Sequence, residues 1–312
     1  MTPIRRLATV SATAAISIGL FSTAASAGDL TDYLDRAQES TYTANRLVVS
    51  VWGDQTQVST AFVEHSYGME MVRVDTTWTM VGNGTSVTVN DSPQGVAFVT
   101  HAEPIDTGRY TIGEVVDVRH MRRDCQIVDV LEDGKLRASI LIDVRTGAPL
   151  ISEMFTDAGN VFRRSSLQDF KAYRTYAGPK DTRAFEYEIV MPVESDVLPR
   201  LMAGYQLVGI FPAPGGAEQG FYSDGLFSFS LFTLSDTAAV SGFETPGTMV
   251  TENGTYDVVA TAHDVRIHWT DGSYDYVIVG DMPPDHAVEI LAELPSPSTR
   301  SMFSRWWNRV FG

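Results

Sequence analysis

Few side chains in this sequence have the spacing that catalysis, metal binding or phosphate binding requires. His263 and His268 lie five residues apart across an expected turn, which does not place two zinc ligands on one face of a strand. The six histidines form no HExxH motif, and there is no Gly-x-Ser-x-Gly nucleophile elbow. Residues 82–84, Gly-Asn-Gly, are typical of a hairpin turn rather than a phosphate-binding loop, because no lysine and no helix follow them. The sequence therefore predicts no catalytic residue, no metal site and no cofactor, and an enzyme is not expected.

Cys125 is the one cysteine of the chain, so it forms no disulfide within the molecule and no CxxC motif. Its neighbours Gln126, Ile127 and Val128 belong to an apolar strand pattern. We interpret Cys125 as a small buried apolar residue rather than as a reactive thiol.

Composition excludes several classes of protein. The chain has 312 residues, with 23 Lys and Arg against 39 Asp and Glu, and a formal net charge of −16. This acidic balance repels phosphate backbones, so nucleic-acid binding is not expected. An apolar fraction of 44% is enough for a folded core, and the length favours two domains.

Residues 1–27 have the pattern of a secretory signal peptide. Arg5 and Arg6 precede an apolar run over 7–21, and residues 25–27 read Ala-Ser-Ala, which is a small-x-small cleavage site. The apolar run is too short to span a bilayer, and no cysteine lies near the cleavage site to receive a lipid. We expect an exported protein whose mature chain begins at Gly28.

The mature chain begins with a helical pattern and then changes to a strand pattern. Leu30, Tyr33, Leu34 and Ala37 follow the spacing of one helix face. From Asn45 the apolar period becomes two, and strands are expected at 58–64, 68–74, 86–90, 96–100, 126–131, 136–143, 149–155 and 162–173. Gly, Asn and Asp separate these segments, as in short turns. One helix and an antiparallel meander are therefore expected for the first domain, residues 28–178.

A second domain is expected at residues 201–294, after a linker at 179–200 that contains Pro179, Pro192 and Pro199. Phe227, Phe229 and Leu231 share one face of a strand, and strands are also expected at 255–262, 265–270 and 273–280. Prolines 283 and 284 favour the start of a helix that runs to Leu294.

The first domain contains more methionine and aromatic side chains than its strands require. Flexible thioethers and aromatic rings suit a cavity for a variable apolar ligand, and an ordinary core with methionine as filler is the alternative. Strand parity predicts that the cavity is lined by Leu47, Val49, Val51, Phe62, Met69, Met71, Trp78, Met80, Val87, Val89 and Met154.

The segment 295–312 differs from the rest of the chain because it is basic and rich in tryptophan. Phe303 and Trp306 lie on one face of a short amphipathic helical pattern, and Arg305 and Arg309 accompany them. Peripheral membrane contact, docking on the acidic surface of the protein or on a partner, and disorder are the three interpretations that stay open.

Several segments resemble the RseB/MucB family of periplasmic regulators of sigma-E signalling. Residues 222–230, Tyr-Ser-Asp-Gly-Leu-Phe-Ser-Phe-Ser, are similar to the signature that opens the small C-terminal domain of the family. Residues 276–285, which end in Val-Gly-Asp-Met-Pro-Pro-Asp, resemble its ending, and 142–150 with 170–173 resemble its large domain. The entry segment 199–205 departs from the family because it lacks the usual tryptophan.

The resemblance implies a mainly β fold with an α+β part. This fold is a LolA-like half-open antiparallel β-barrel with helical cover, followed by a smaller α+β C-terminal domain. It implies a periplasmic negative regulator of the envelope stress response. Such a protein binds the periplasmic domain of an anti-sigma factor of the RseA/MucA type, shields it from proteolysis, and releases it when a lipid or lipopolysaccharide-like ligand binds. A periplasmic lipid or lipoprotein carrier of the LolA/LolB type is the alternative, and homo-oligomerisation stays open.

Overall fold

The computed structural model describes residues 30–53, 55–66, 69–74, 77–82, 85–89, 108–173, 198–213, 217–234 and 247–298. The expected signal peptide, the expected strand at 96–100 and most of the expected linker lie outside these residues, as do Phe303, Arg305, Trp306 and Arg309 of the basic tail. Neither of the two described helices has the length and apolar character needed to cross a membrane.

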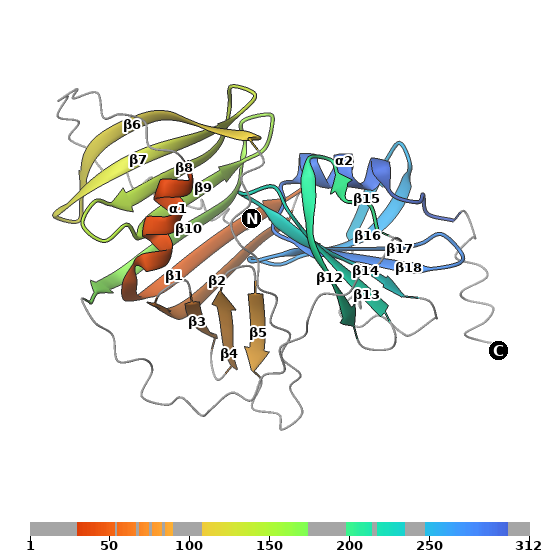
Figure 1. The fold of residues 1–312 in the computed structure, drawn as a ribbon, viewed down its shortest axis with the longest axis horizontal. Helices are drawn as coiled ribbons and strands as arrows, with labels where there is room; N and C mark the ends of the chain where they lie inside the picture. The colour runs from red at the N-terminus through yellow and green to blue at the C-terminus, as the bar shows by residue number, and fades with distance from the viewer. Residues whose placement is uncertain are drawn as a thin grey trace, which may run out of the picture.

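The first half of the chain forms one helix and a sheet of ten strands (Figure 1). The elements are α1 (Leu30–Glu39), β1 (Thr41–Trp52), β2 (Gln55–Ser66), β3 (Met69–Val74), β4 (Thr77–Gly82), β5 (Thr85–Val89), β6 (Tyr110–His120), β7 (Arg123–Glu132), β8 (Lys135–Asp143), β9 (Pro149–Phe155) and β10 (Val161–Ala172). The strands pair in the order β5-β4-β3-β2-β1-β10-β9-β8-β7-β6, and each pair is antiparallel.

The first sheet is open within the described ranges, because β5 and β6 form its two edges. Figure 1 shows the sheet bending so that β6 and β7 lie above β2 to β5 in the view. Helix α1 is held to the sheet by Arg36, whose Nη2 donates to the carbonyl oxygen of Val144 at 3.0 Å. This arrangement confirms the expectation of a half-open, mainly antiparallel β fold.

Tight turns explain the regular hairpins of β7 to β10. Asp133 and Gly134 both have positive φ, 50° and 77°, which suits a two-residue turn between β7 and β8. Gly159, with φ 78°, lies in the turn between β9 and β10. Both hairpins match the segments expected from the alternation of apolar residues. Strand β6 was not predicted, because a bulge between Ile112 and Val115 interrupts its alternation.

The second half of the chain forms an eight-stranded sheet and one helix. The elements are β11 (Leu201–Met202), β12 (Tyr205–Ala213), β13 (Ala217–Ser223), β14 (Ser228–Leu234), β15 (Gly247–Thr251), β16 (Gly254–Ala260), β17 (Val265–Thr270), β18 (Asp275–Gly280) and α2 (Pro284–Glu293). The strand order is β11-β12-β13-β14-β18-β17-β16-β15. Helix α2 has proline in its first turn and buries His286, Ala287, Ile290 and Leu291.

The two sheets share a hydrophobic core. Trp52 and Phe162 of the first sheet belong to the same cluster of buried side chains as Tyr222, Phe227 and Tyr256 of the second. The rings of Phe162 and Phe227 have their centroids 6.0 Å apart. Because aromatic side chains bury large apolar areas, this contact stabilises the packing of one sheet against the other.

Candidate functional site

Ten of the eleven predicted cavity residues lie on one face of the first sheet. Asn45 pairs with Phe62 across β1 and β2, Phe62 pairs with Arg73 across β2 and β3, and Met71 pairs with Met80 across β3 and β4. Opposite residues of antiparallel strands share a face, as do residues two apart in one strand. The register therefore places on this face Leu47, Val49, Val51, Phe62, Met69, Met71, Trp78, Met80, Val87 and Val89.

This apolar face is partly open where β1 meets β2. Leu47, Val49 and Phe62 are half-buried, whereas Val51 is 37% exposed and Val58, opposite Val49, is 62% exposed. Apolar side chains that stay accessible on one face suit an apolar ligand. The lining of a lipid cavity by these residues stays a prediction.

Met154, the eleventh predicted residue, lies on the opposite face. It pairs with Arg163, which in turn pairs with Ser50, one residue away from Val49 and Val51 in β1. Met154 packs against the core shared by the two sheets. The structure therefore separates Met154 from the other ten residues.

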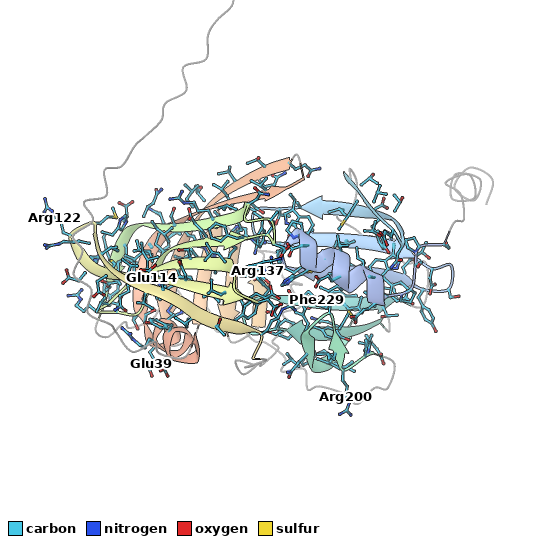
Figure 2. The ribbon with its side chains drawn as sticks, turned by 90° about the horizontal axis from the view of Figure 1, so that it is seen from above. Glu39, Glu114, Arg122, Arg137, Arg200 and Phe229 are labelled. Atoms are coloured by element: carbon cyan, nitrogen blue, oxygen red, sulfur yellow. The ribbon has the colours of Figure 1, made fainter. Side chains whose placement is uncertain are left out.

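A buried cluster of charged side chains joins the two sheets, and we call it the joint. It consists of Arg109, Glu132 and Arg137 from the first sheet and its edge, with Asp224, Asp285 and His286 from the second sheet and α2. Figure 2 shows Arg137 where the first sheet meets α2.

Glu132 lies at the centre of the joint, because it accepts hydrogen bonds from the Nε atoms of both Arg109 and Arg137. Arg137 also forms an ion pair with Asp285, with its Nη1 2.7 Å from Oδ2. Arg109 donates through Nη1 to the carbonyl oxygen of Ala203 at 2.7 Å. Glu132 and Arg137 are 7% and 4% exposed, so these charges interact in a region of low dielectric constant.

His286 connects the helix to this cluster. Its Nε2 lies 3.0 Å from Nη2 of Arg109 and 3.1 Å from Nη2 of Arg137. The same Nε2 lies 3.1 Å from Oε2 of Glu132, and because a carboxylate oxygen only accepts, Nε2 donates to Glu132. Nδ1 lies 2.8 Å from Oη of Tyr205, within hydrogen-bond distance. His286 is completely buried, so its ring has no contact with solvent.

The segment that resembles the family signature supplies another part of the joint. Oδ1 of Asp224 accepts the backbone N–H groups of Leu226 and Phe227 at 3.0 and 2.7 Å, which fixes the turn before β14. Its Oδ2 accepts the hydroxyl group of Tyr110, from the first sheet, at 2.6 Å. Asp285 comes from the second resembling segment, 276–285. Both C-terminal segments that carry the resemblance therefore converge on the joint.

Electrostatics in the joint depend on burial and on the arginines. Burial acts to raise the pKa of Glu132, but hydrogen bonds from His286 and Arg109 outweigh it and lower the pKa from 4.5 to about 2. Burial also raises the pKa of Tyr110, and the neighbouring charge of Asp224 raises it further. Glu132 is therefore ionised and Tyr110 is neutral at physiological pH.

A polar cavity of about 840 Å³ lies beside the joint. Charged side chains of both signs line it, among them Lys135 and Asp157 from the first sheet and Glu289 from α2. Gln206 and the backbone of Gly204 line the side formed by the second sheet. This lining suits a polar segment with charges of both signs better than it suits an acyl chain.

The charged side chains of the joint attach the first sheet to the second sheet and α2. Its histidine and carboxylates are engaged with arginines, and within the described residues no three His, Cys, Asp or Glu side chains are grouped as a metal ion requires. His268 lies within ion-pair distance of Asp257 and Asp275. Cys125 is buried, and burial raises the pKa of its thiol, in agreement with an inert apolar role.

The phenol of Tyr110 provides a first test of the joint. Replacing Tyr110 by phenylalanine should lower the free energy of unfolding by about 1.5–3 kcal/mol, because a buried carboxylate loses a charge-assisted hydrogen bond. Urea unfolding of the mature chain measures this change. Tyr274→Phe is the matched control, because Tyr274 is 45% exposed and its hydroxyl group makes no contact with the joint. Equal stability of the two variants would contradict the assigned contact.

No protein-family model and no curated protein matches the sequence. Among solved structures, the MucA/MucB complex of Pseudomonas aeruginosa matches with a TM-score of 0.51 and 17% identity over 83% of this chain and 96% of that chain. A crystal structure of MucB matches with a TM-score of 0.50 and 17% identity over 83% of this chain and 95% of that chain. The chain has a MucB-like fold. This finding confirms the fold expected from the family resemblance, and the MucB-like fold extends over both sheets.

Proposed function

We propose that this protein is a periplasmic regulator that binds the periplasmic segment of an anti-sigma factor and shields it from proteolysis. The MucB-like fold over 83% of the chain supports this function most strongly, because one of the similar structures is a complex of MucA with MucB. The convergence of both C-terminal resembling segments on the joint adds support, because these segments position the two sheets relative to each other.

A lipid carrier is the second candidate, and the apolar face of the first sheet favours it. A carrier requires only that sheet, however, and the second sheet with its joint would have no role in it. In the regulator, a lipid bound to the apolar face would favour one arrangement of the two sheets and weaken partner binding through the other. We therefore assign the lipid a releasing role within the regulator.

The partner segment is expected to be basic. The chain has 39 acidic and 23 basic residues, so charge complementarity favours a cationic partner and accelerates its association. The lining of the polar cavity beside the joint has five carboxylates and three cations, and this net negative charge favours a segment whose own charges are mainly basic.

Binding to the co-encoded anti-sigma factor tests the proposal. The mature chain, 28–312, should retain the periplasmic segment of that anti-sigma factor in a pull-down, protect it from added protease, and release it when lipid is present. The cytoplasmic segment of the same factor is the negative control. Failure to bind the periplasmic segment with or without lipid, together with tight binding of acyl chains, would replace the regulator by the carrier.

Export forms part of the same proposal. Periplasmic function requires removal of residues 1–27, so the protein purified from cells should begin at Gly28. N-terminal sequencing of the secreted form checks this, and a form that retains Arg5 and Arg6 would contradict export through a cleavable signal.

A further inference from the structure

Arg163 of β10 forms a second contact between the sheets, and this contact is incomplete. Its Nη1 donates to the carbonyl oxygen of Asp281, in the segment between β18 and α2, at 3.2 Å. The carboxylate of Asp281 is farther away, with Oδ2 3.9 Å from the same nitrogen. The side chain of Arg163 is only 12% exposed, so solvent does little to stabilise its charge.

The remaining donors of Arg163 have no acceptor among the described residues. Its Nε and Nη2 are both buried and make no hydrogen bond there. These two atoms form one edge of the planar guanidinium group, and that edge can donate two parallel hydrogen bonds to a carboxylate. Burial lowers the pKa of Arg163, and the charges of Asp281 and Asp264 oppose this only in part.

Two more buried donors lie on the same face of the sheet. Ser50 is the residue directly opposite Arg163 across β1 and β10, and Trp52 is two residues farther along β1. Oγ of Ser50 and Nε1 of Trp52 are buried, and neither atom has a hydrogen-bond partner among the described residues. Ser50 is 1% exposed and Trp52 is 8% exposed. Folded proteins leave few buried donors unpaired, so three such side chains on one face are unusual.

The chemistry of these donors selects the ligand. Water is neutral and brings donors of its own, so it does not balance the guanidinium charge. An oxyanion brings only acceptors, and a planar carboxylate matches the Nε and Nη2 edge of Arg163. The ring of Phe162, whose centroid is 5.6 Å from Cζ of Arg163, and Met154 on the neighbouring strand make the surroundings apolar, which strengthens an ionic hydrogen bond.

We propose that Arg163, with Ser50 and Trp52, forms a carboxylate-binding site between the two sheets. The ligand is either a small organic acid or the carboxylate of an acidic side chain, and both present the same planar group. Because Arg163 also contacts Asp281, an occupied site would couple the ligand to the arrangement of the sheets. This site is separate from the joint at Glu132 and from the apolar face.

The experiment uses the mature chain and the indole N–H signal of Trp52, assigned by its loss in Trp52→Phe. Acetate and a glutamate capped at both ends are titrated against chloride at equal ionic strength, with phosphate as a tetrahedral oxyanion. We expect acetate or the capped glutamate to shift the Trp52 signal and to raise the midpoint of thermal unfolding, with a dissociation constant of about 1–10 mM, typical of a small ligand held by a few hydrogen bonds. The stronger of the two responses identifies the source of the carboxylate.

Variants of two adjacent arginines give the control. Arg163→Lys keeps a positive charge but loses the planar Nε and Nη2 edge of the guanidinium group. This variant should bind the carboxylate at least 10-fold more weakly, because it cannot donate two parallel hydrogen bonds. Arg164→Gln should bind as the unaltered chain does, because Arg164 lies on the other face and is 54% exposed. If Arg163→Lys fails to fold, the proposal is tested by whether acetate or the capped glutamate shifts the Trp52 signal in the unaltered chain and in Arg164→Gln. A Trp52 signal that responds to no oxyanion, or to phosphate alone, would overturn the carboxylate site, as would unchanged binding by Arg163→Lys.

Discussion

Replacing Glu132 by glutamine is expected to lower the free energy of unfolding by about 3–5 kcal/mol, because it removes one partner from a buried network of ion pairs. Glutamine has nearly the same shape as glutamate, so the change tests charge rather than volume. Arg109 and Arg137 would then lose the carboxylate that accepts from both. Two buried guanidinium charges would remain close to each other and to His286.

Urea unfolding, followed by tryptophan fluorescence and by circular dichroism, measures this loss. Glu153→Gln is the matched control, because Glu153 forms an ion pair with Arg164 in which the two side chains are 31% and 54% exposed. An exposed pair of this kind contributes about 1 kcal/mol or less. If Glu132→Gln were as stable as Glu153→Gln, the joint would not be an important connection between the sheets.

Much of the fold follows from local sequence pattern. The hairpins from β7 to β10 were predicted because apolar residues alternate along the strands and because Gly134 and Gly159 supply the positive φ of the turns. The helix after Pro283 was predicted from proline at its start. The order of pairing, which brings β1 beside β10, depends on contacts between residues 41–52 and 161–172, and no local pattern encodes that distance.

The apolar face illustrates what strand parity can predict. Ten residues fall on one face because each strand from β1 to β5 keeps an unbroken period of two through its register. Met154 lies on the other face because its position is set by pairing with Arg163 near a bulge in β10, which parity within β9 alone does not reveal.

The joint could not be predicted from sequence. Arg109, Glu132 and His286 are far apart in the chain, and they belong to no shared motif. The available signals were the acidic residues within the two resembling segments, Asp224 and Asp285, because a carboxylate in an apolar setting requires a partner when it is buried. Those signals do not identify the partner, which is set by the packing of the two sheets.

Acid should lower the free energy of unfolding in a defined pH range, because Glu132 takes up a proton there. The pKa of Glu132 is about 2 in the folded protein, below its ordinary value of 4.5. As pH falls, the unfolded chain takes up this proton first, so the stabilisation is complete above about pH 4.5 and is lost as pH falls from there to about 2. A difference of about 2.5 pKa units corresponds to about 3 kcal/mol, which matches the lower end of the loss expected for Glu132→Gln.

The difference between the unaltered chain and Glu132→Gln isolates this effect. Every other side chain is the same in the two proteins, so subtracting the two unfolding free energies isolates the contribution of residue 132. We expect the difference to be constant between pH 5 and 7 and to shrink by about 3 kcal/mol between pH 4.5 and 2. Urea unfolding at each pH measures it. Parallel stability curves over that range would mean that the arginines do not hold Glu132 ionised, and a difference that grows in acid would reverse the assigned direction of its pKa.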